Sequence, residues 1–370
     1  MKTGLNIGFF GSSLVSAYWN GAATYYRGII KALHALGHRV TFYEPDAFER
    51  QKHRDIPDPP WADVVVYPAE DPAAVSRLVE NAARKADVLV KASGVGVLDN
   101  VLEAAVLAYK RAGQTTIFWD VDAPATLARI RQARKDPLGE LIPHYDWIWT
   151  YGGGDAVVNA YRSLGARACV PIYNAVDPET HFPVLPEARL TADVSLLANR
   201  LPDREERIDE FFFRPAASLP NGTFLLGGNG WHDKPLPPNV RTLGHVYTAD
   251  HNALFASSNL VLNVSRNDMA TVGYSPATRV FEAAGVGACI ITDAWDGIDF
   301  FFEPGHEILV AQDGDHVTEL VRSTYPGRAR DIGASARQRV LRDHTYTIRA
   351  HQIESLLVHQ RDNVLLMGYA

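Results

Sequence analysis

Short apolar segments alternate with amphipathic helical segments along most of this chain, and this alternation constrains its fold more than any other feature. In the first half, apolar segments stand at residues 5–10, 39–43, 63–67, 87–91, 115–119, 146–150 and 168–172. Helical patterns separate them at residues 23–36, 73–85, 101–112 and 126–135. Strands that alternate with helices in this way form βαβ units and a parallel sheet that is covered on both faces. The first half therefore predicts a doubly wound, Rossmann-like domain with right-handed crossovers.

A proline-containing turn at residues 174–183 (NAVDPETHFP) interrupts this pattern, and a polar stretch runs on to Asp193. A second alternation follows. Apolar strand candidates stand at 194–198, 223–226, 240–243, 259–264, 288–292 and 307–310, with helical patterns from about residue 205 and at 277–284 and 316–323. We therefore expect an α/β protein of two Rossmann-like domains, residues 1–173 and 174–345, that face each other across a cleft. Ligands of such sheets bind at the carboxyl ends of the strands.

Two helical segments, near residues 329–343 and 346–359, follow the second domain. The last one carries enough apolar residues for one buried face, namely Ile348, Ile353, Leu356, Leu357 and Val358. Because it follows a complete α/β domain, it has no further strand to cover. We expect residues 346–370 to cross the cleft and return to the first domain. A helix that packs only on its own domain is the alternative.

Composition and charge narrow the function. The 370 residues are 46% hydrophobic and 21% charged, and the formal net charge is −7. An acidic chain is a poor binder of nucleic acid, which needs a basic field, so a small-molecule enzyme is expected. No uncharged apolar run approaches the roughly 18 residues of a transmembrane segment, and the N-terminal apolar stretch reads as a first strand. Cys169 and Cys289 are expected to be buried thiols of a cytoplasmic protein.

Residues 273–284 (GYSPATRVFEAA) carry the strongest local signal. Ser275 fits a helix N-cap and Pro276 fits the first helical position. The free amides of such a helix end, with the positive end of its dipole, form a natural diphosphate site. Arg279 can reach the same phosphates, and Glu282, one turn later, can accept hydrogen bonds from ribose hydroxyls. The alternative is an amphipathic helix with a good cap and a surface Glu–Arg pair.

A glycine-rich loop after a strand gives a second, weaker signal. Gly228 and Gly230 let the backbone approach a ligand, and Trp231 offers a face on which a ring can stack. His245 follows another strand, where a nucleobase could bond to the backbone. Many turns between strands and loops are rich in glycine, and a lone histidine there is often an ordinary loop residue.

In the first domain, Trp19, Asn20 and Gly21 precede the first long helix. A loop of small residues at this position usually holds a phosphate or an acceptor. It lacks the G-x-G-x-x-G fingerprint of dinucleotide enzymes, which argues against a nicotinamide cofactor. The aromatic residues around it suit a sugar acceptor.

Asp120 and Asp122 follow the apolar strand at 115–119. Two carboxylates at the end of a buried strand are costly to place without a role, so we interpret them as catalytic, as a general base or as ligands of sugar hydroxyls. Two other interpretations remain open. Asp-x-Asp is also a manganese motif of single-domain glycosyltransferases, and Asp122 could simply cap the helix that begins before Pro124.

Together these motifs resemble the CgeB-type spore-maturation glycosyltransferases, which have the GT-B fold and are related to the family 4 glycosyltransferases. The resemblance is best over roughly residues 190–350. It rests on spaced segments in the same order, at residues 193–198, 202–204, 228–231, 279–283, 287–288, 302–307 and 344–346. The first half matches more loosely, through Trp119 with Asp122 and Pro124, and through residues 174–177.

The resemblance implies a hexosyltransferase-like enzyme that moves a sugar from a nucleoside-diphosphate sugar, such as a UDP-sugar, to a glycan, protein or small-molecule acceptor. The first domain would bind the acceptor and the second the donor, with no metal and no cofactor besides the donor. The residues expected to bind the donor are Arg200, Arg204, Arg207, Gly228, Gly230, Trp231, His245, Tyr274, Ser275, Thr278, Arg279 and Glu282.

One position departs from the family pattern. Family 4 enzymes carry a second glutamate eight positions before the one that matches Glu282, and Tyr274 stands there in this chain. This departure puts the contacts to the donor sugar in question. A nucleotide-sugar epimerase or hydrolase on the same fold, or a non-catalytic relative that binds nucleotide or glycan, are the alternative functions.

Overall fold

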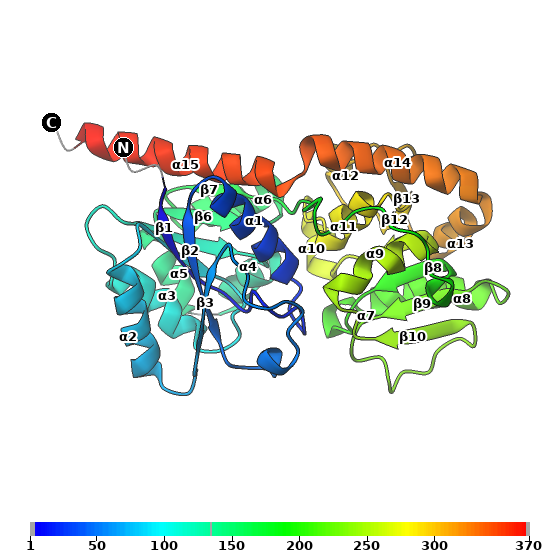
Figure 1. Ribbon diagram of the computed structural model, residues 1–370, viewed down its shortest axis with the longest axis horizontal. Helices are drawn as coiled ribbons and strands as arrows, with labels where there is room; N and C mark the ends of the chain where they lie inside the picture. The colour runs from blue at the N-terminus through cyan, green and yellow to red at the C-terminus, as the bar shows by residue number, and fades with distance from the viewer. Residues whose placement is uncertain (1–3, 134, 368–370) are drawn as a thin grey trace.

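The computed structural model describes residues 4–133 and 135–367, with side chains up to residue 357. Within these residues the chain forms two fully parallel sheets (Figure 1). The first has seven strands in the order β3-β2-β1-β4-β5-β6-β7, and the second has six in the order β10-β9-β8-β11-β12-β13. In each sheet the chain adds strands first on one side of the first strand and then on the other side, between β1 and β4 and between β8 and β11. Such a change of side is the switch point where α/β sheets bind ligands. The predicted α/β fold with two Rossmann-like domains is confirmed.

The first sheet consists of β1 (Asn6–Phe10), β2 (Arg39–Pro45), β3 (Asp63–Tyr67), β4 (Val88–Ala92), β5 (Thr115–Asp120), β6 (Trp147–Thr150) and β7 (Cys169–Pro171). The helices of this domain are α1 (Ala23–Ala35), α2 (Pro72–Ala83), α3 (Asp99–Ala108), α4 (Ala123–Gln132), α5 (Pro137–Leu141) and α6 (Gly154–Ser163). Two short 3₁₀ turns lie at Arg50–Lys52 and Ile142–His144.

The second sheet consists of β8 (Ala192–Leu197), β9 (Phe224–Gly227), β10 (Val240–Gly244), β11 (Ser258–Asn263), β12 (Ile290–Asp293) and β13 (Leu309–Ala311). Its helices are α7 (Pro202–Ile208), α8 (Arg214–Ser218), α9 (Thr248–Ser257), α10 (Asn267–Val272), α11 (Thr278–Val286), α12 (Ile298–Phe301), α13 (Gly314–Ser323) and α14 (Pro326–Asp343). A 3₁₀ turn at Ala188–Leu190 precedes the sheet, and a π-helical turn at Asp209–Phe213 joins α7 to α8.

The central strands of each sheet are buried on both faces, which explains why they are almost continuously apolar, whereas the edge strands β3 and β10 are partly exposed. Successive residues of a strand point to opposite faces. In the first sheet, Phe9 and Trp119 therefore pack with α1, whereas Phe10 and Phe118 pack with α2 and α3 on the other face. This layering leaves only the strand ends free to carry polar site residues.

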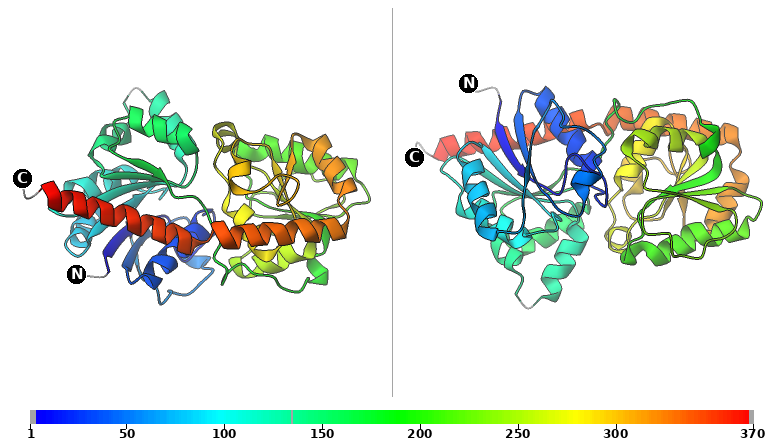
Figure 2. Two further views of the ribbon diagram at one scale, coloured as in Figure 1. Left: turned by 90° about the horizontal axis from the view of Figure 1, so that it is seen from above. Right: turned by 60° about the horizontal axis from the view of Figure 1, so that its bottom comes forward.

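The last helix, α15 (Tyr346–Met367), leaves the second domain and runs along the first, as Figures 1 and 2 show. Tyr346, Ala350, Ile353 and Leu357 belong to the same buried cluster as the inner face of α1. The predicted return of this helix to the first domain is confirmed. Its buried face differs in part from the predicted one, because Ile348 is 36% exposed. The side chain of Val358 lies outside the described residues.

The two chain crossings between the domains lie side by side. The Val176 amide donates to the His344 carbonyl at 2.8 Å, and the Tyr346 amide donates to the Val176 carbonyl at 3.1 Å. The Arg349 guanidinium of α15 donates to the Tyr173 carbonyl at 3.1 Å. The linker and the α14–α15 junction thus form one bonded hinge.

Two predictions from composition can be compared with the structure. Cys169 and Cys289 are buried free thiols, and burial raises the pKa of both to about 12. Among the described residues, no helix is both long enough and apolar enough to span a membrane.

The close packing of α1 on α15 gives a test of the hinge. A Cβ at Gly28 would overlap the ring of Tyr346. We expect Gly28→Ala to lower the free energy of unfolding by about 1–3 kcal/mol through overpacking. This loss would occur although alanine in place of a helical glycine normally stabilises by about 1 kcal/mol.

Denaturant unfolding measures the change, with Gly21→Ala as the control because a Cβ there meets nothing within 4 Å. A Gly28→Ala variant as stable as the parent would contradict the observed docking of α15.

Candidate active site

A cleft opens where the carboxyl ends of both sheets face each other. Its larger cavity, of about 330 Å³, is lined from both domains; its lining includes Ser12, Trp19, Asn20, Gly21, Asp122, Tyr151, Asn199, Arg204, Ser265, Arg266, Thr278 and Arg279. A smaller cavity of about 100 Å³ shares five of the lining residues, including Asn20, Thr278 and Arg279, and continues to Gly228, His245 and Glu282. The two cavities form one continuous site.

The start of α11 lies at the centre of this site, but it begins later than predicted. Ala277, not Ser275, occupies the N-cap, and the Ser275 hydroxyl donates to the Gly273 carbonyl at 2.9 Å. The prediction of Ser275 as the N-cap and Pro276 as the first helical residue is therefore wrong. The physical reason is that Gly273 and Tyr274 take positive φ angles of 75° and 47°, which turn the chain once more before the helix starts. The first free amides of the helix are those of Thr278 and Arg279, which line both cavities.

Two guanidinium groups with buried Nε atoms face the larger cavity; Arg204 is buried as a whole and Arg279 is half-buried. Arg204 of α7 donates to the Asn199 carbonyl at 2.6 Å, and Arg279 donates to the Asn263 side chain at 3.1 Å. Each leaves its Nε–H buried without an acceptor among the described residues. Burial, together with the positive charges of Arg279 and Arg266, lowers the pKa of Arg204 to about 9. An anion bound between these groups would accept from the unpaired Nε–H donors. It would also offset the repulsion between the positive charges.

Glu282 lies one turn further along α11 and is 5% exposed. Its Oε1 atom has no hydrogen-bond partner within the described part of the chain, and its Oε2 atom lies 3.8 Å from Nδ1 of His251. Burial alone would raise the pKa of Glu282, but His181, His251, a hydrogen bond with Thr24 and the charge of Arg279 together hold it below its ordinary value. The site therefore offers an ionised acceptor beside the two arginines.

Comparisons with known proteins identify the architecture. The chain superimposes on the structure titled sucrose-phosphate synthase (tll1590) from Thermosynechococcus elongatus with a TM-score of 0.70 and 15% identity, covering 96% of this chain and 99% of that one. It also matches Anabaena Alr3699/HepE in complex with UDP-glucose, with a TM-score of 0.69, 14% identity and coverage of 96% and 100%. The chain has the GT-B glycosyltransferase fold.

Further matches agree with this fold. An alpha-glucosyltransferase in complex with UDP-glucose and DNA aligns with a TM-score of 0.68, 12% identity and coverage of 96% and 100%. Residues 204–355 match the family model described as glycosyl transferase-like. No curated protein matches the sequence. Membership of the CgeB-type subgroup stays a prediction.

The three arginines predicted for the donor occupy different environments in this GT-B fold. Arg204 lines the larger cavity, as described above. Arg200 forms ion pairs of 2.7 Å with Glu205 and Asp233, and Arg207 forms one of 2.6 Å with buried Asp293. Neither Arg200 nor Arg207 lines the cleft cavities. The structure thus singles out Arg204.

Two other predicted donor residues are misplaced for that role. Trp231 is 3% exposed, and its indole N–H donates to the Ala198 carbonyl at 2.7 Å, so it is a core residue and offers no stacking face. Tyr274 lies in a separate cavity with Gly153, Gly154 and Phe300, because the turn before α11 points its ring away from the cleft. Gly228 and His245 do line the smaller cavity, whereas Gly230 lies beside it with a positive φ of 89°.

The two aspartates after β5 also differ. Asp120 is fully buried and accepts hydrogen bonds from the hydroxyls of Ser93 at 2.7 Å, Thr126 at 3.0 Å and Tyr161. It lines neither cleft cavity and holds the end of the strand, so the structure gives it a structural role, and its catalytic role stays a prediction. Asp122 lines the larger cavity and forms an ion pair with Arg266 of the other domain.

The environment of Asp122 leaves its predicted role open. Burial raises its pKa, and Arg266 offsets part of this effect. Its side chain makes no capping bond to α4, although it occupies the N-cap position. Trp19, Asn20 and Gly21 line the cleft opposite the start of α11, as a loop that holds an acceptor or a phosphate would.

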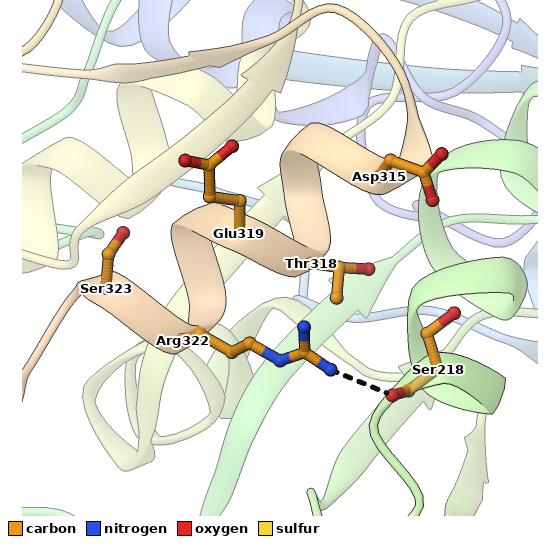
Figure 3. A pocket seen from close by; sticks show the side chains of 6 residues that line it. All are labelled: Ser218, Asp315, Thr318, Glu319, Arg322 and Ser323. Atoms are coloured by element: carbon orange, nitrogen blue, oxygen red, sulfur yellow. Dashed lines mark hydrogen bonds between the residues drawn. The ribbon is translucent and has the colours of Figure 1, made fainter.

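Sequence reasoning missed several residues of the site. Arg266 and Ser265 follow β11, and Asn199 follows β8, so each stands directly after an apolar strand. Because ligands of such sheets bind at the carboxyl ends of the strands, this position could have identified them from the sequence. Figure 3 shows a different cavity, on the outer side of the second domain between α8 and α13, where Arg322 donates to the Ser218 carbonyl at 3.4 Å. Only these two helices line it, so it does not belong to the cleft.

The contrast between the two aspartates is testable by paired substitutions. We expect Asp120→Asn to lower the free energy of unfolding by about 1–3 kcal/mol, because it disrupts a buried network of charged hydrogen bonds. Asp122→Asn should change stability much less, since Arg266 keeps Asp203 as a second partner at 2.5 Å.

Denaturant unfolding of the two variants beside the parent measures this difference. Equal losses of stability in both variants would contradict the assignment of Asp120 to structure and of Asp122 to the cleft.

Proposed function

We propose that this chain transfers a sugar from a nucleoside-diphosphate sugar to an acceptor hydroxyl across the cleft. The observation that carries the proposal is the pair of guanidiniums, Arg204 and Arg279, next to the free amides at the start of α11. Neither guanidinium forms an ion pair with a carboxylate in the described residues, so a bound anion would meet positive charge and unpaired N–H donors in the site. A diphosphate supplies that anion and is also the leaving group of glycosyl transfer.

The donor fits the two cavities in one orientation. The diphosphate lies against Arg204, Arg279 and the amide of Thr278, and the ribose hydroxyls donate to the free Oε1 atom of Glu282. The nucleobase then lies in the smaller cavity, near Gly228 and His245. The neighbours with this fold that are titled as complexes with UDP or UDP-glucose support a uridine nucleotide. The sugar points into the larger cavity.

Each group has a defined task when the sugar moves. The bond between the anomeric carbon and the diphosphate oxygen breaks, and negative charge grows on the leaving oxygen. The guanidiniums and the helix amides stabilise that charge in a low-dielectric cleft, where such interactions are strongest. This is the work that a metal ion performs in other transferases, so we propose that the leaving group here needs no metal.

The acceptor would enter from the side of the first domain. Trp19 is 40% exposed at the cleft and offers a ring face to a sugar or another flat acceptor. Asp122 lies in the same cavity and would take up the acceptor proton or bind its hydroxyls. For this its ion pair with Arg266 has to open, and Asp203 then retains Arg266. The acceptor itself is a glycan, a protein or a small molecule.

The donor site is tested by removing one guanidinium. Arg279→Ala should weaken UDP binding by about 1.5–3 kcal/mol, because a charged hydrogen bond to the diphosphate is lost. Titration calorimetry with UDP measures the affinity. Arg200→Ala is the matched control, since Arg200 lines neither cleft cavity, is already paired with Glu205 and Asp233, and should leave UDP affinity unchanged.

The activity is tested by incubating the protein with a panel of nucleotide sugars, with and without candidate acceptors, and measuring the nucleotide that is released. Release that depends on the acceptor supports transfer. Release into water alone would favour a hydrolase, and an unchanged UDP affinity in Arg279→Ala would contradict the placement of the donor.

A further inference from the structure

Two histidines meet Glu282 behind the smaller cavity. His181 belongs to the linker between the domains, His251 to α9, and Glu282 to α11. Nε2 of His181 lies 3.4 Å from Nδ1 of His251, which lies 3.8 Å from Oε2 of Glu282. All three atoms lie within 4.8 Å of one another, and all three residues are buried. Three separate elements thus bring three potential ligand atoms to one point.

Hydrogen bonds explain this arrangement poorly. Buried polar groups are normally paired at about 2.7–3.2 Å, and these separations are longer. The 3.4 Å separation of the two imidazole nitrogens does match the spacing of ligands around a metal ion, whereas the 3.8 Å separation of His251 from Glu282 is longer. In a tetrahedral site with metal–nitrogen bonds of about 2.0–2.1 Å, neighbouring ligand atoms lie roughly 3.3–3.5 Å apart. A small adjustment of the Glu282 side chain would bring all three atoms to bonding distance of one ion.

The chemistry of the three groups suits a zinc-class cation. Both imidazoles are buried, and the lone pair of an unprotonated ring nitrogen is a common metal ligand. Two imidazoles and one carboxylate are a known ligand set for zinc, whereas Mg²⁺ and Ca²⁺ prefer oxygen ligands alone. Arg27 lies nearby, but it is neutralised by Asp55 at 2.9 Å.

A fourth ligand position is available. His181 and Glu282 also line a cavity of about 290 Å³ between the linker, α1 and the loop of residues 56–61. A water molecule in this cavity could complete a tetrahedral site. The Oε1 atom of Glu282 has no hydrogen-bond partner among the described residues, so it can accept from another partner.

We propose that His181, His251 and Glu282 bind one divalent cation of the zinc class. The ion ties the interdomain linker to α9 and α11 and fixes the orientation of Glu282. Under the proposed function, on which only this last consequence rests, the same carboxylate would bind the ion through Oε2 and the donor ribose through Oε1. This ion is separate from the diphosphate, which is neutralised by arginines.

The test uses the full chain without a polyhistidine tag, first stripped by a chelator and then titrated with Co²⁺. Tetrahedral Co²⁺ gives an intense visible absorption, which we expect to saturate at one equivalent and to disappear when Zn²⁺ is added. His251→Asn and His181→Asn should each abolish the band. His351→Asn is the matched control, because His351 is 59% exposed on α15 and should leave the band unchanged.

The parent protein decides the proposal even if a variant fails to fold. A parent that shows no tetrahedral Co²⁺ band, and that retains no zinc by elemental analysis, overturns the metal site. A band that persists in His251→Asn overturns it as well. UDP affinity measured on the same samples separates the two proposals, since the metal site can fail while UDP still binds, and UDP binding can fail while the band remains.

Discussion

The burial of Arg204 on α7 and the partial burial of Arg279 at the start of α11 are the constraint on which the rest of this structure depends. Arg204 and Arg279 lose hydration and repel each other, and this lowers the pKa of Arg204 to about 9. Such an arrangement costs stability unless an anion binds between the groups. Arg204 and Arg279 are each held by a hydrogen bond, to the Asn199 carbonyl and to the Asn263 side chain, which leaves part of each guanidinium available to an anion. The fold thereby keeps a preformed anion site in the cleft.

Contacts between the domains determine how this site is enclosed. The Gly153 amide donates to the Tyr274 carbonyl at 2.8 Å, and the Asn174 side chain donates to the Pro276 carbonyl at 2.8 Å. Both bonds connect the first domain or the linker to the turn that precedes α11. A movement of the domains at the hinge would therefore displace the start of α11, which faces the proposed diphosphate site. This coupling gives domain closure a physical route to the donor.

Much of the fold could be predicted from the sequence, because the spacing of apolar residues indicates which faces of the strands and helices are buried. The alternation of apolar strands and helices predicted two parallel sheets, and the apolar face after residue 346, taken together with the resemblance to GT-B enzymes, predicted the return of α15. Arg279 and Glu282 were placed in one site because their spacing on a helix puts them one turn apart. Their roles toward a donor stay predictions, as does every other role in the cleft.

The errors at the site arise from local geometry that spacing does not encode. Ser275-Pro276 has the composition of a helix start, but two preceding residues with positive φ delay α11 to Thr278. Asp120 and Asp122 look equivalent in sequence. In the structure, Asp120 is the last residue of β5, whereas Asp122 lies in the loop beyond it. Trp231 follows a glycine-rich loop, and only the tertiary packing decides that its ring enters the core.

The most direct measurement of the central claim is a crystal structure of this protein with UDP. The account predicts that the diphosphate oxygens lie within hydrogen-bond distance of Arg204, Arg279 and the Thr278 amide, with the ribose hydroxyls on Oε1 of Glu282. UDP bound elsewhere, or bound with these two guanidiniums still unpaired, would contradict it.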